Sequence, residues 1–358
     1  MKNFVFICGI GDSYYHASIK PFADIAYGFS LIGSASTLLL HEKNAKLKSA
    51  IKDITDDRYQ ILTYRKSNAH KVIQDISPDY IVTDDYLVNM KTGIENRTST
   101  SKLIIYAQIL FGLSTLDPFI RQKSIVFSLS SLAPWRILTQ RYVATISKAN
   151  YIVSNSHVSA SLLQHLYGIH SDTVVYPPVG ISMRKYIELS ESKKRNGILI
   201  FMGRREDYFL RNIKEEILNF KNLTDDPIKI LVKDEMLSKM FRDSGAEIYA
   251  NVSSEKLSYL ISSSLLTYVP TMLELFGHVG AESLMFRTPV LLDTYHPFLE
   301  MVPHWNECVF ISHPRESLYE NYVRIIESLG NRSIDNDAIL DSYSASSSAS
   351  SLERMVNY

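Results

Sequence analysis

The sequence predicts an α/β protein made of two doubly wound parallel-sheet domains, one after the other. Short apolar runs rich in β-branched residues alternate with amphipathic stretches along most of the chain, and this alternation is typical of βαβ units. The chain has 358 residues, enough for two domains that each bury a core. A polar, charged stretch at residues 181–196 separates two such series, so we place a linker there.

The first series predicts a domain over residues 1–180. Two prolines, Pro177 and Pro178, end its last strand because proline cannot continue a sheet ladder. The expected helices cover Ile19–Ile32, His70–Ile76, a mostly helical segment around Pro134–Lys148, and Ala160–Tyr167. The expected strands are Phe4–Cys8, Thr37–Leu40, Ile61–Tyr64, Tyr80–Thr83, Leu103–Ala107, Tyr151–Ser154 and Thr173–Tyr176.

The second series predicts a domain over residues 197–336, followed by a tail over 337–358. The tail is rich in serine and ends in apolar residues at helical spacing, so disorder and a helix packed back on the first domain both stay open. The expected helices are Leu210–Phe220, Glu235–Ser244, Glu255–Ser262, His278–Phe286 and Ser317–Leu329. The expected strands are Ile198–Met202, Ile228–Val232, Glu247–Tyr249, Leu265–Val269, Pro289–Leu292 and Cys308–Ile311.

The composition disfavours nucleic acid as the main partner. Lysine plus arginine and aspartate plus glutamate number 38 each, so the chain has no overall basic field. The two cysteines, Cys8 and Cys308, lie in apolar runs far apart, which favours reduced thiols and a cytoplasmic location. No apolar run is long enough to span a membrane, and a weak peripheral contact through Lys43, Lys46 and other lysines of the first domain stays open.

The most informative stretch follows the strand Leu265–Val269. Gly277 precedes a helical pattern, so unpaired backbone N–H groups at the helix start can hold a diphosphate. Glu274 precedes this helix and Glu282 lies within it, and carboxylates so placed can accept hydrogen bonds from sugar or ribose hydroxyls. Two sheets in tandem place such loops at a cleft between their carboxyl ends, where ligands of doubly wound sheets bind.

This stretch resembles the retaining GT-B glycosyltransferases of family 4. The shared features are two glutamates separated by seven residues, Phe-Gly after the first glutamate, a small residue before the second, and a closing Pro-Val strand. The resemblance implies a GT-B fold with a Rossmann-like acceptor domain first and a nucleotide-sugar-binding domain second, facing an interdomain cleft. It implies that Glu282 holds the ribose and that Glu274 contacts the donor sugar or lies near its transferring carbon. It also implies that the diphosphate meets the backbone of Leu275, Phe276, Gly277 and His278.

The resemblance extends to a Gly-Arg pair at the end of the second domain's first strand. Gly203 and Arg204 stand there, and Arg211 follows as a second cation, although the family more often has Lys-Gly at that point. Two guanidinium groups can stabilise the charge that develops on a leaving diphosphate. By analogy with the family, the nucleotide base meets the backbone at Val232, Lys233 and Val252.

In the first domain, glycines follow the first strand, and polar residues follow the later ones. Gly9 and Gly11 let a substrate approach the backbone closely. Gln108 stands where the family commonly has a histidine facing the donor sugar, and an amide can hydrogen-bond but cannot carry a proton. The remaining acceptor-side candidates are Asp12, His16, Asp84 and Asp85, the last two being adjacent aspartates of a kind that also forms turns.

We therefore expect transfer of a sugar, with retention, from a nucleotide-diphosphate sugar to a hydroxyl of a glycan, a lipid-linked molecule or a small molecule. No cofactor and no metal is expected if the two arginines and a helix end neutralise the diphosphate. One alternative is a sugar-nucleotide enzyme of another reaction type, such as an epimerase. Another is a catalytically weak nucleotide-binding or scaffold protein on the same fold. The sequence identifies neither the donor sugar and base nor the acceptor.

Overall fold

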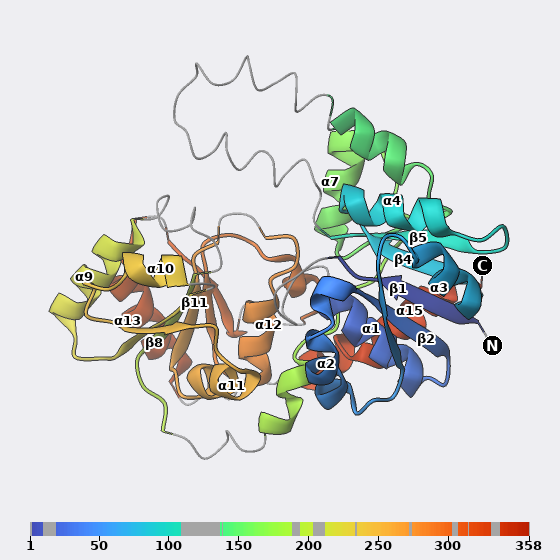
Figure 1. Cartoon of the computed structure of the whole chain (residues 1–358). Helices are drawn as coiled ribbons and strands as arrows, with labels where there is room; N and C mark the ends of the chain where they lie inside the picture. The colour runs from blue at the N-terminus through green and yellow to red at the C-terminus, as the bar shows by residue number, and fades with distance from the viewer. Residues whose placement is uncertain are drawn as a thin grey trace. The chain divides into compact units, whose positions relative to one another are not determined.

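The structure is a computed structural model in which two compact units can be distinguished (Figure 1). One unit comprises Met1–Ile181 together with Tyr343–Tyr358, and the other comprises Ser182–Ser342. Each contains one parallel sheet with helices, which confirms the predicted α/β fold class. The structure describes residues 2–9, 19–108, 137, 139–187, 194–202, 212–232, 235–271, 274–302, 307–313, 315–330 and 337–357.

The sheet of the first unit has seven strands in the order β3-β2-β1-β4-β5-β6-β7, and each strand pair is parallel. The order reverses between β1 and β4, so the switch point of this sheet lies at their carboxyl ends. The strands are β1 (Asn3–Ile7), β2 (Ala35–His41), β3 (Gln60–Tyr64), β4 (Tyr80–Asp84), β5 (Lys102–Ala107), β6 (Tyr151–Ser154) and β7 (Thr173–Val174).

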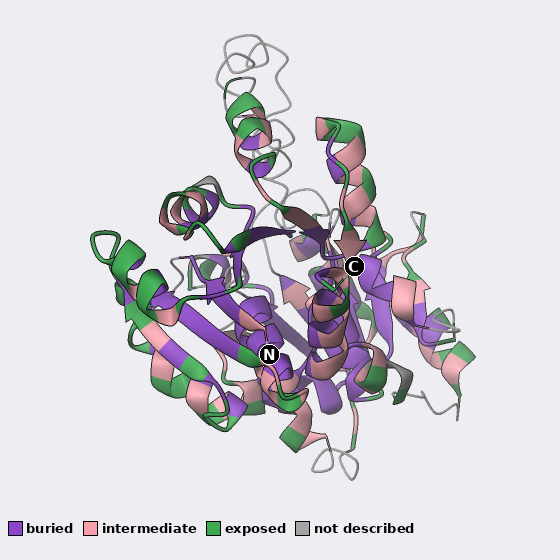
Figure 2. Ribbon diagram, turned by 90° about the vertical axis from the view of Figure 1, so that its right-hand side faces the viewer, coloured by how far each residue is buried: buried purple, intermediate pink, exposed green. Residues whose placement is uncertain are grey.

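Helices cover this sheet, and its strands are mostly buried (Figure 2). The buried core of the unit includes Phe4, Phe6, Phe22 and Phe29, which pack between β1 and α1. The helices described in this unit are α1 (Lys20–Leu31), the 3-10 helix η1 (Glu42–Asn44), α2 (Leu47–Thr55), α3 (Ala69–Ile76), α4 (Leu87–Asn96), α7 (His157–Tyr167) and α15 (Ala345–Met355). Residues 139–146 are also helical, within the segment expected to be mostly helical around Pro134–Lys148.

The sheet of the second unit has six parallel strands in the order β10-β9-β8-β11-β12-β13. Its order reverses between β8 and β11, which places the switch point beside the loop that follows β11. The strands are β8 (Ile198–Met202), β9 (Ile228–Val232), β10 (Glu247–Ala250), β11 (Leu266–Val269), β12 (Val290–Leu292) and β13 (Val309–Ile311). The helices are η3 (Ile181–Tyr186), α9 (Ile213–Leu223), α10 (Glu235–Met240), α11 (Ser254–Ser262), α12 (His278–Met285), η5 (Pro297–Met301), α13 (Leu318–Leu329) and α14 (Asp337–Ser342).

The serine-rich tail forms helix α15, which packs closely against α1. Ser344 caps its start by accepting a hydrogen bond from the Ser347 N–H at 3.2 Å. A side chain at Gly28 of α1 would collide with the Ala345 carbonyl, so small residues on both helices permit this contact. Leu352 of α15 is fully buried in the core of the first unit. The tail therefore helps to hold this unit together, and Lys2 donates to the Val356 carbonyl at 2.9 Å, so the chain ends lie side by side.

Helices α2, α4 and α14 were not expected from the sequence. Helix α2 buries Leu47 and Ile51, which lie four residues apart, in the core. Most of its other residues are polar, so its apolar pattern in the sequence is weak. Helix α4 contains Gly93, a poor helix former. A side chain there would lie 2.7 Å from Thr83 Cγ2 and 3.0 Å from Leu103, so Gly93 allows α4 to approach the sheet.

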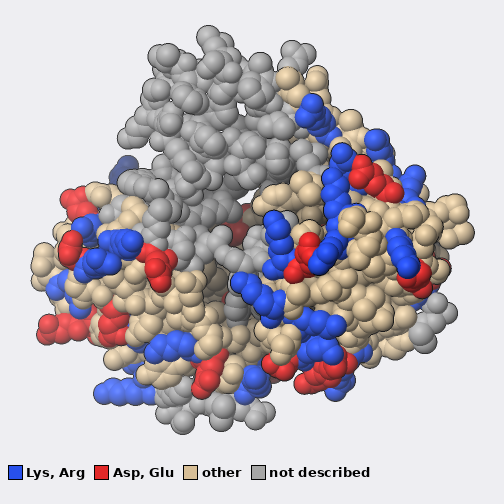
Figure 3. All heavy atoms as spheres, in the orientation of Figure 1, with Lys and Arg blue, Asp and Glu red and all other residues tan. Residues whose placement is uncertain are grey.

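Other elements are shorter than expected. The helix expected over Glu235–Ser244 ends at Met240, and the strand expected over Thr173–Tyr176 ends at Val174. Acidic and basic side chains are interspersed over the described part of the face shown in Figure 3, which agrees with the balanced composition.

Candidate functional site

The loop between β11 and α12 is the centre of the candidate site in the second unit. Gly277 caps α12 with φ +96° and ψ 54°, a left-handed conformation that a residue with a Cβ rarely adopts. Helix α12 begins at His278, and its first-turn N–H groups have no acceptor within the helix. The loop therefore presents the positive end of a helix at the carboxyl edge of the sheet, where an anion can bind.

The loop after β12 supports this turn from behind, a role that the sequence analysis did not assign. The Phe298 N–H donates to the Phe276 carbonyl at 2.8 Å, and the Thr294 hydroxyl donates to the Thr271 carbonyl at 3.0 Å. His296, fully buried, lies directly against Gly277: a Cβ there would be 2.8 Å from its Nδ1 atom. The sequence offered one signal, a His-Pro-Phe triplet that begins four residues after the end of the strand β12.

The two glutamates of the motif differ in burial. Glu274 is half-buried, and its Oε1 atom accepts a hydrogen bond from the Leu275 N–H at 3.3 Å. Glu282 lies in the second half of α12 and is only 2% exposed. A buried carboxylate is stabilised by hydrogen-bond donors, and the hydroxyls of a ligand are donors of this kind.

The opposite end of α12 is held by Arg195. Its guanidinium donates to the Phe286 carbonyl at 2.7 Å and to the Arg287 carbonyl at 2.5 Å. A cation at a helix C-terminus opposes the negative end of the macrodipole and satisfies orphan carbonyls. Burial and the neighbouring Arg287 lower the pKa of Arg195, although an arginine stays protonated throughout the physiological range. Arg195 thus fixes α12 against the start of β8.

The other predicted donor residues divide into two groups. Val232 and Val252 lie at the carboxyl ends of neighbouring strands, since Val232 pairs with Ala250 in the sheet and Val252 follows two residues later. Both are at the same sheet edge as the β11–α12 loop. Gly203, Arg204, Arg211 and Lys233 lie outside the described residues.

In the first unit, Asp85 holds the backbone of Gln108. Its Oδ1 atom accepts a hydrogen bond from the Gln108 N–H at 3.1 Å, and its Oδ2 atom accepts from the Tyr142 hydroxyl at 3.2 Å. Asp85 is fully buried and Gln108 is 9% exposed. Tyr142 was not singled out in the sequence, because a tyrosine in a helical pattern carries no sign of a partner 57 positions away. The pKa of its hydroxyl is raised by burial and by Asp85, so it stays a donor.

Asp84, which precedes Asp85 in the chain, forms a turn. Its Oδ1 atom accepts hydrogen bonds from the Tyr86 N–H at 3.1 Å and from the Asn89 amide at 2.8 Å, which organises the start of α4. Gly9 follows β1, and its carbonyl accepts a hydrogen bond from the buried amide of Asn44 at 2.7 Å. Burial and Asp84 raise the pKa of the Cys8 thiol, which therefore stays protonated. Gly11, Asp12 and His16 lie outside the described residues.

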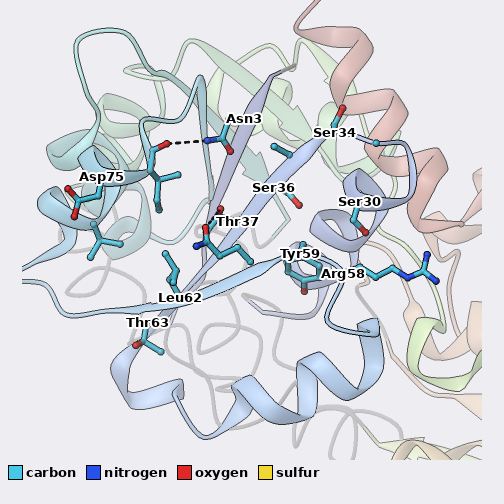
Figure 4. A pocket seen from close by; sticks show the side chains of 15 residues that line it. Asn3, Ser30, Ser34, Ser36, Thr37, Arg58, Tyr59, Leu62, Thr63 and Asp75 are labelled. Atoms are coloured by element: carbon cyan, nitrogen blue, oxygen red, sulfur yellow. Dashed lines mark hydrogen bonds between the residues drawn. The ribbon is translucent and has the colours of Figure 1, made fainter.

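A groove of about 900 Å³ in the first unit lies at the wrong edge of the sheet to be this site (Figure 4). It is lined at the starts of β1 and β2 by Asn3, Ser36 and Thr37, and its other side chains are a mixture of hydroxyl, amide, charged and apolar groups. Ligands of doubly wound sheets bind at the carboxyl ends, where Gly9 and Gln108 lie. We therefore do not include this groove in the candidate site.

Within the described ranges, no group of three His, Cys, Asp or Glu side chains is placed to hold a metal ion. Metal independence stays a prediction. In the same part of the chain, no helix has the length and apolar character needed to cross a membrane.

Comparison with known proteins reveals similarity at the level of structure. No protein-family profile matches the chain, and no curated protein sequence matches it. Sucrose-phosphate synthase from Thermosynechococcus elongatus superimposes with a TM-score of 0.67 and 11% identity, covering 100% of this chain and 98% of that one. Anabaena HepE, solved with UDP and glucose, has a TM-score of 0.67 and 12% identity, with full coverage of both chains.

The chain has the GT-B fold. Both matches span essentially the whole of each protein, and both sheets of this chain have the doubly wound parallel order. UDP-GlcNAc 2-epimerase from Neisseria meningitidis also matches over the full length of both chains, with a TM-score of 0.55 and 12% identity. The fold is therefore shared by proteins of more than one reaction type, and the reaction must be argued from the site.

Proposed function

We propose that this protein is a glycosyltransferase that moves a sugar, with retention, from a nucleotide-diphosphate sugar to a hydroxyl acceptor. The observation that carries the proposal is the β11–α12 loop, where a glycine-capped helix start, Glu274 and the buried Glu282 occur together at a sheet switch point. The structural match to HepE, which was solved with UDP and glucose, supports a nucleotide sugar as the donor.

The proposed roles follow the chemistry of each group. The diphosphate binds the backbone N–H groups at the start of α12, which carry partial positive charge. Glu282 accepts hydrogen bonds from the ribose hydroxyls, and Glu274 accepts them from the donor sugar. Val232 and Val252 contact the base. Arg204 and Arg211 stabilise the leaving diphosphate, so that no metal ion is required.

On the acceptor side, we propose that Gln108 faces the donor sugar and hydrogen-bonds to it. The contact from Asp85 supports this, because it fixes the backbone of Gln108 at the carboxyl end of β5. An amide cannot move a proton, so proton transfer from the acceptor must use another group. The free, buried state of Cys8 and Cys308 supports a reducing, cytoplasmic location.

An epimerase of nucleotide sugars is the second candidate, and the match to UDP-GlcNAc 2-epimerase favours it. A binding protein with weak or no turnover is the third, since Gln108 replaces a residue that can carry a proton. The three candidates differ in what they release from a donor.

The test is an incubation of the full chain with UDP-, GDP- and ADP-sugars, alone and with a panel of hydroxyl acceptors. The proposal predicts nucleotide release that depends on an acceptor, and a product whose anomeric configuration, read from proton NMR couplings, matches that of the donor. An inverted product contradicts retention. Nucleotide released or sugar altered without any glycosylated acceptor favours the epimerase. Nucleotide bound but never consumed favours the binding protein.

A matched pair of conditions tests the role of a metal. Activity that is unchanged by a chelator supports charge neutralisation by the arginines and the helix end. Activity lost on chelation and restored by a divalent cation contradicts it.

A further inference from the structure

Two buried side chains hold the backbone directly after β1. The Asn44 amide donates to the Gly9 carbonyl at 2.7 Å, and the Tyr64 hydroxyl donates to the Cys8 carbonyl at 3.4 Å. Asn44 is fully buried and Tyr64 is 5% exposed. The carbonyls of two consecutive residues therefore each have a side-chain donor at the point where the chain leaves the sheet.

Both donors come from neighbouring strand ends at the carboxyl edge of the sheet. Strands β2 and β3 are paired as far as His41 and Tyr64, and η1, which ends in Asn44, begins directly after His41. Burial, with Cys8 and Asp84 nearby, raises the pKa of the Tyr64 hydroxyl, so this group keeps its proton and stays a donor. The two contacts are thus built into the ends of two strands rather than into the loop that they hold.

These contacts fix the direction of the peptide group between Cys8 and Gly9. In a planar trans peptide, the carbonyl and the following N–H point in opposite directions. Because the Cys8 carbonyl is directed at Tyr64, the Gly9 N–H points away from that side chain. Gly9 is buried, yet its N–H meets no acceptor among the residues that the structure describes. Buried backbone N–H groups are rarely left without a partner, so this donor suits an oxygen of a ligand.

We propose that Asn44 and Tyr64 are positioning residues, which orient the Gly9 N–H so that it donates to a substrate oxygen during the reaction. The inference rests on the proposed glycosyltransferase function. Gly9 follows β1 at the switch point of the first sheet, where ligands of doubly wound sheets bind. A donor whose direction is fixed before the substrate binds needs no reorganisation when negative charge develops. Its misorientation should therefore lower kcat more than it weakens binding of the nucleotide.

The kinetic test compares variants that each lose one buried side-chain donor to a backbone carbonyl. Asn44→Ala and Tyr64→Phe act beside Gly9, and Tyr64→Phe removes only a hydroxyl, so it keeps the test valid if the other variant does not fold. The control Ser36→Ala loses the hydroxyl that donates to the Ala26 carbonyl at 2.8 Å, at the amino end of β2.

The expected results separate positioning from a merely structural role. Asn44→Ala should lower kcat at least about tenfold, and Tyr64→Phe should lower it less because its hydrogen bond is longer. Ser36→Ala should keep the kcat of the wild-type protein, although its lost hydrogen bond is shorter than that of Tyr64. Nucleotide affinity, measured by calorimetry, should be unchanged in all three variants, because the proposed donor loop belongs to the second unit.

A second readout needs neither substrate nor turnover. The chain has 14 glycines, so selective isotope labelling of glycine gives few amide resonances in an NMR spectrum, and Gly9→Ala identifies the resonance of Gly9. Asn44→Ala and Tyr64→Phe should each shift this resonance in the free protein, and Ser36→Ala should not.

The proposal is overturned if the Gly9 resonance is the same in Asn44→Ala and Tyr64→Phe as in the wild-type protein, or if Ser36→Ala lowers kcat as much as Asn44→Ala does. Absence of turnover with every nucleotide sugar would instead refute the proposed function, and the Gly9 resonance would still test the orientation of this peptide group.

Discussion

Alanine at position 277 should destabilise the second unit and weaken nucleotide binding together. The backbone there has φ +96°, which costs a residue with a Cβ about 1–2 kcal/mol. The added methyl group would also lie 2.8 Å from His296 Nδ1 and 3.0 Å from Phe298 Cδ1. Overpacking of this kind costs about 1–3 kcal/mol. The free energy of unfolding should therefore fall by about 2–5 kcal/mol in Gly277→Ala.

Gly245→Ala is the matched control. Gly245 also has a positive φ, +70°, but a Cβ there meets nothing within 4 Å. It should lose only the backbone contribution, about 1–2 kcal/mol, and leave nucleotide affinity unchanged. Urea unfolding followed by circular dichroism measures the first quantity, and calorimetric titration measures the second. Equal destabilisation by the two substitutions, or unchanged nucleotide affinity in Gly277→Ala, would refute the account of this turn.

Three further predictions concern the rest of the chain. Leu352→Ala, in the buried face of the tail helix α15, should lower the free energy of unfolding by about 2–5 kcal/mol, measured by thermal unfolding. The control Leu223→Ala, at a side chain that is 57% exposed, should lower it little. Equal effects of the two substitutions would show that the tail does not stabilise the first unit. Asp85→Asn should lower kcat while leaving nucleotide affinity unchanged, because it disturbs Gln108 and not the donor loop; a loss of affinity alone would contradict this. Burial raises the pKa of Cys308 to about 11, so the unfolded chain loses this proton first, and stability should fall as pH rises from about 8.5 towards that value. Urea midpoints measured from pH 8 upward, with Cys308→Ala as the control, check the sign.

The sequence predicts most of the architecture because the evidence lies in local pattern. Apolar strand runs such as Ile228–Val232 match β9 in both bounds, and the helix pattern after Ser317 matches α13, where Ser317 and Glu320 form a capping box. The local sequence pattern does not predict an element whose formation depends on a tertiary contact. Helix α4 depends on the room that Gly93 leaves beside Thr83, and no local signal records that room.

The residues of the candidate site also divide into those that a local sequence pattern predicts and those that depend on tertiary contacts. The turn at Gly277 and the helix after it could be read from their own residues. The support from His296, Phe298 and Arg195 could not, because each of these side chains acts on a segment that is distant in sequence. The role of Tyr142 as a donor to Asp85 likewise exists only once β4 and the helical residues 139–146 are folded together. Residues that hold a site in place leave weaker traces in sequence than residues that form it.

The most direct test of the central claim is a calorimetric titration of the purified protein with UDP, GDP and ADP, repeated on Glu282→Gln and Arg204→Ala. We expect one nucleotide to bind and both substitutions to weaken it by more than about 1 kcal/mol, as the loss of charged hydrogen bonds should. If no nucleotide binds, or if binding is indifferent to both substitutions, the proposed donor site is wrong.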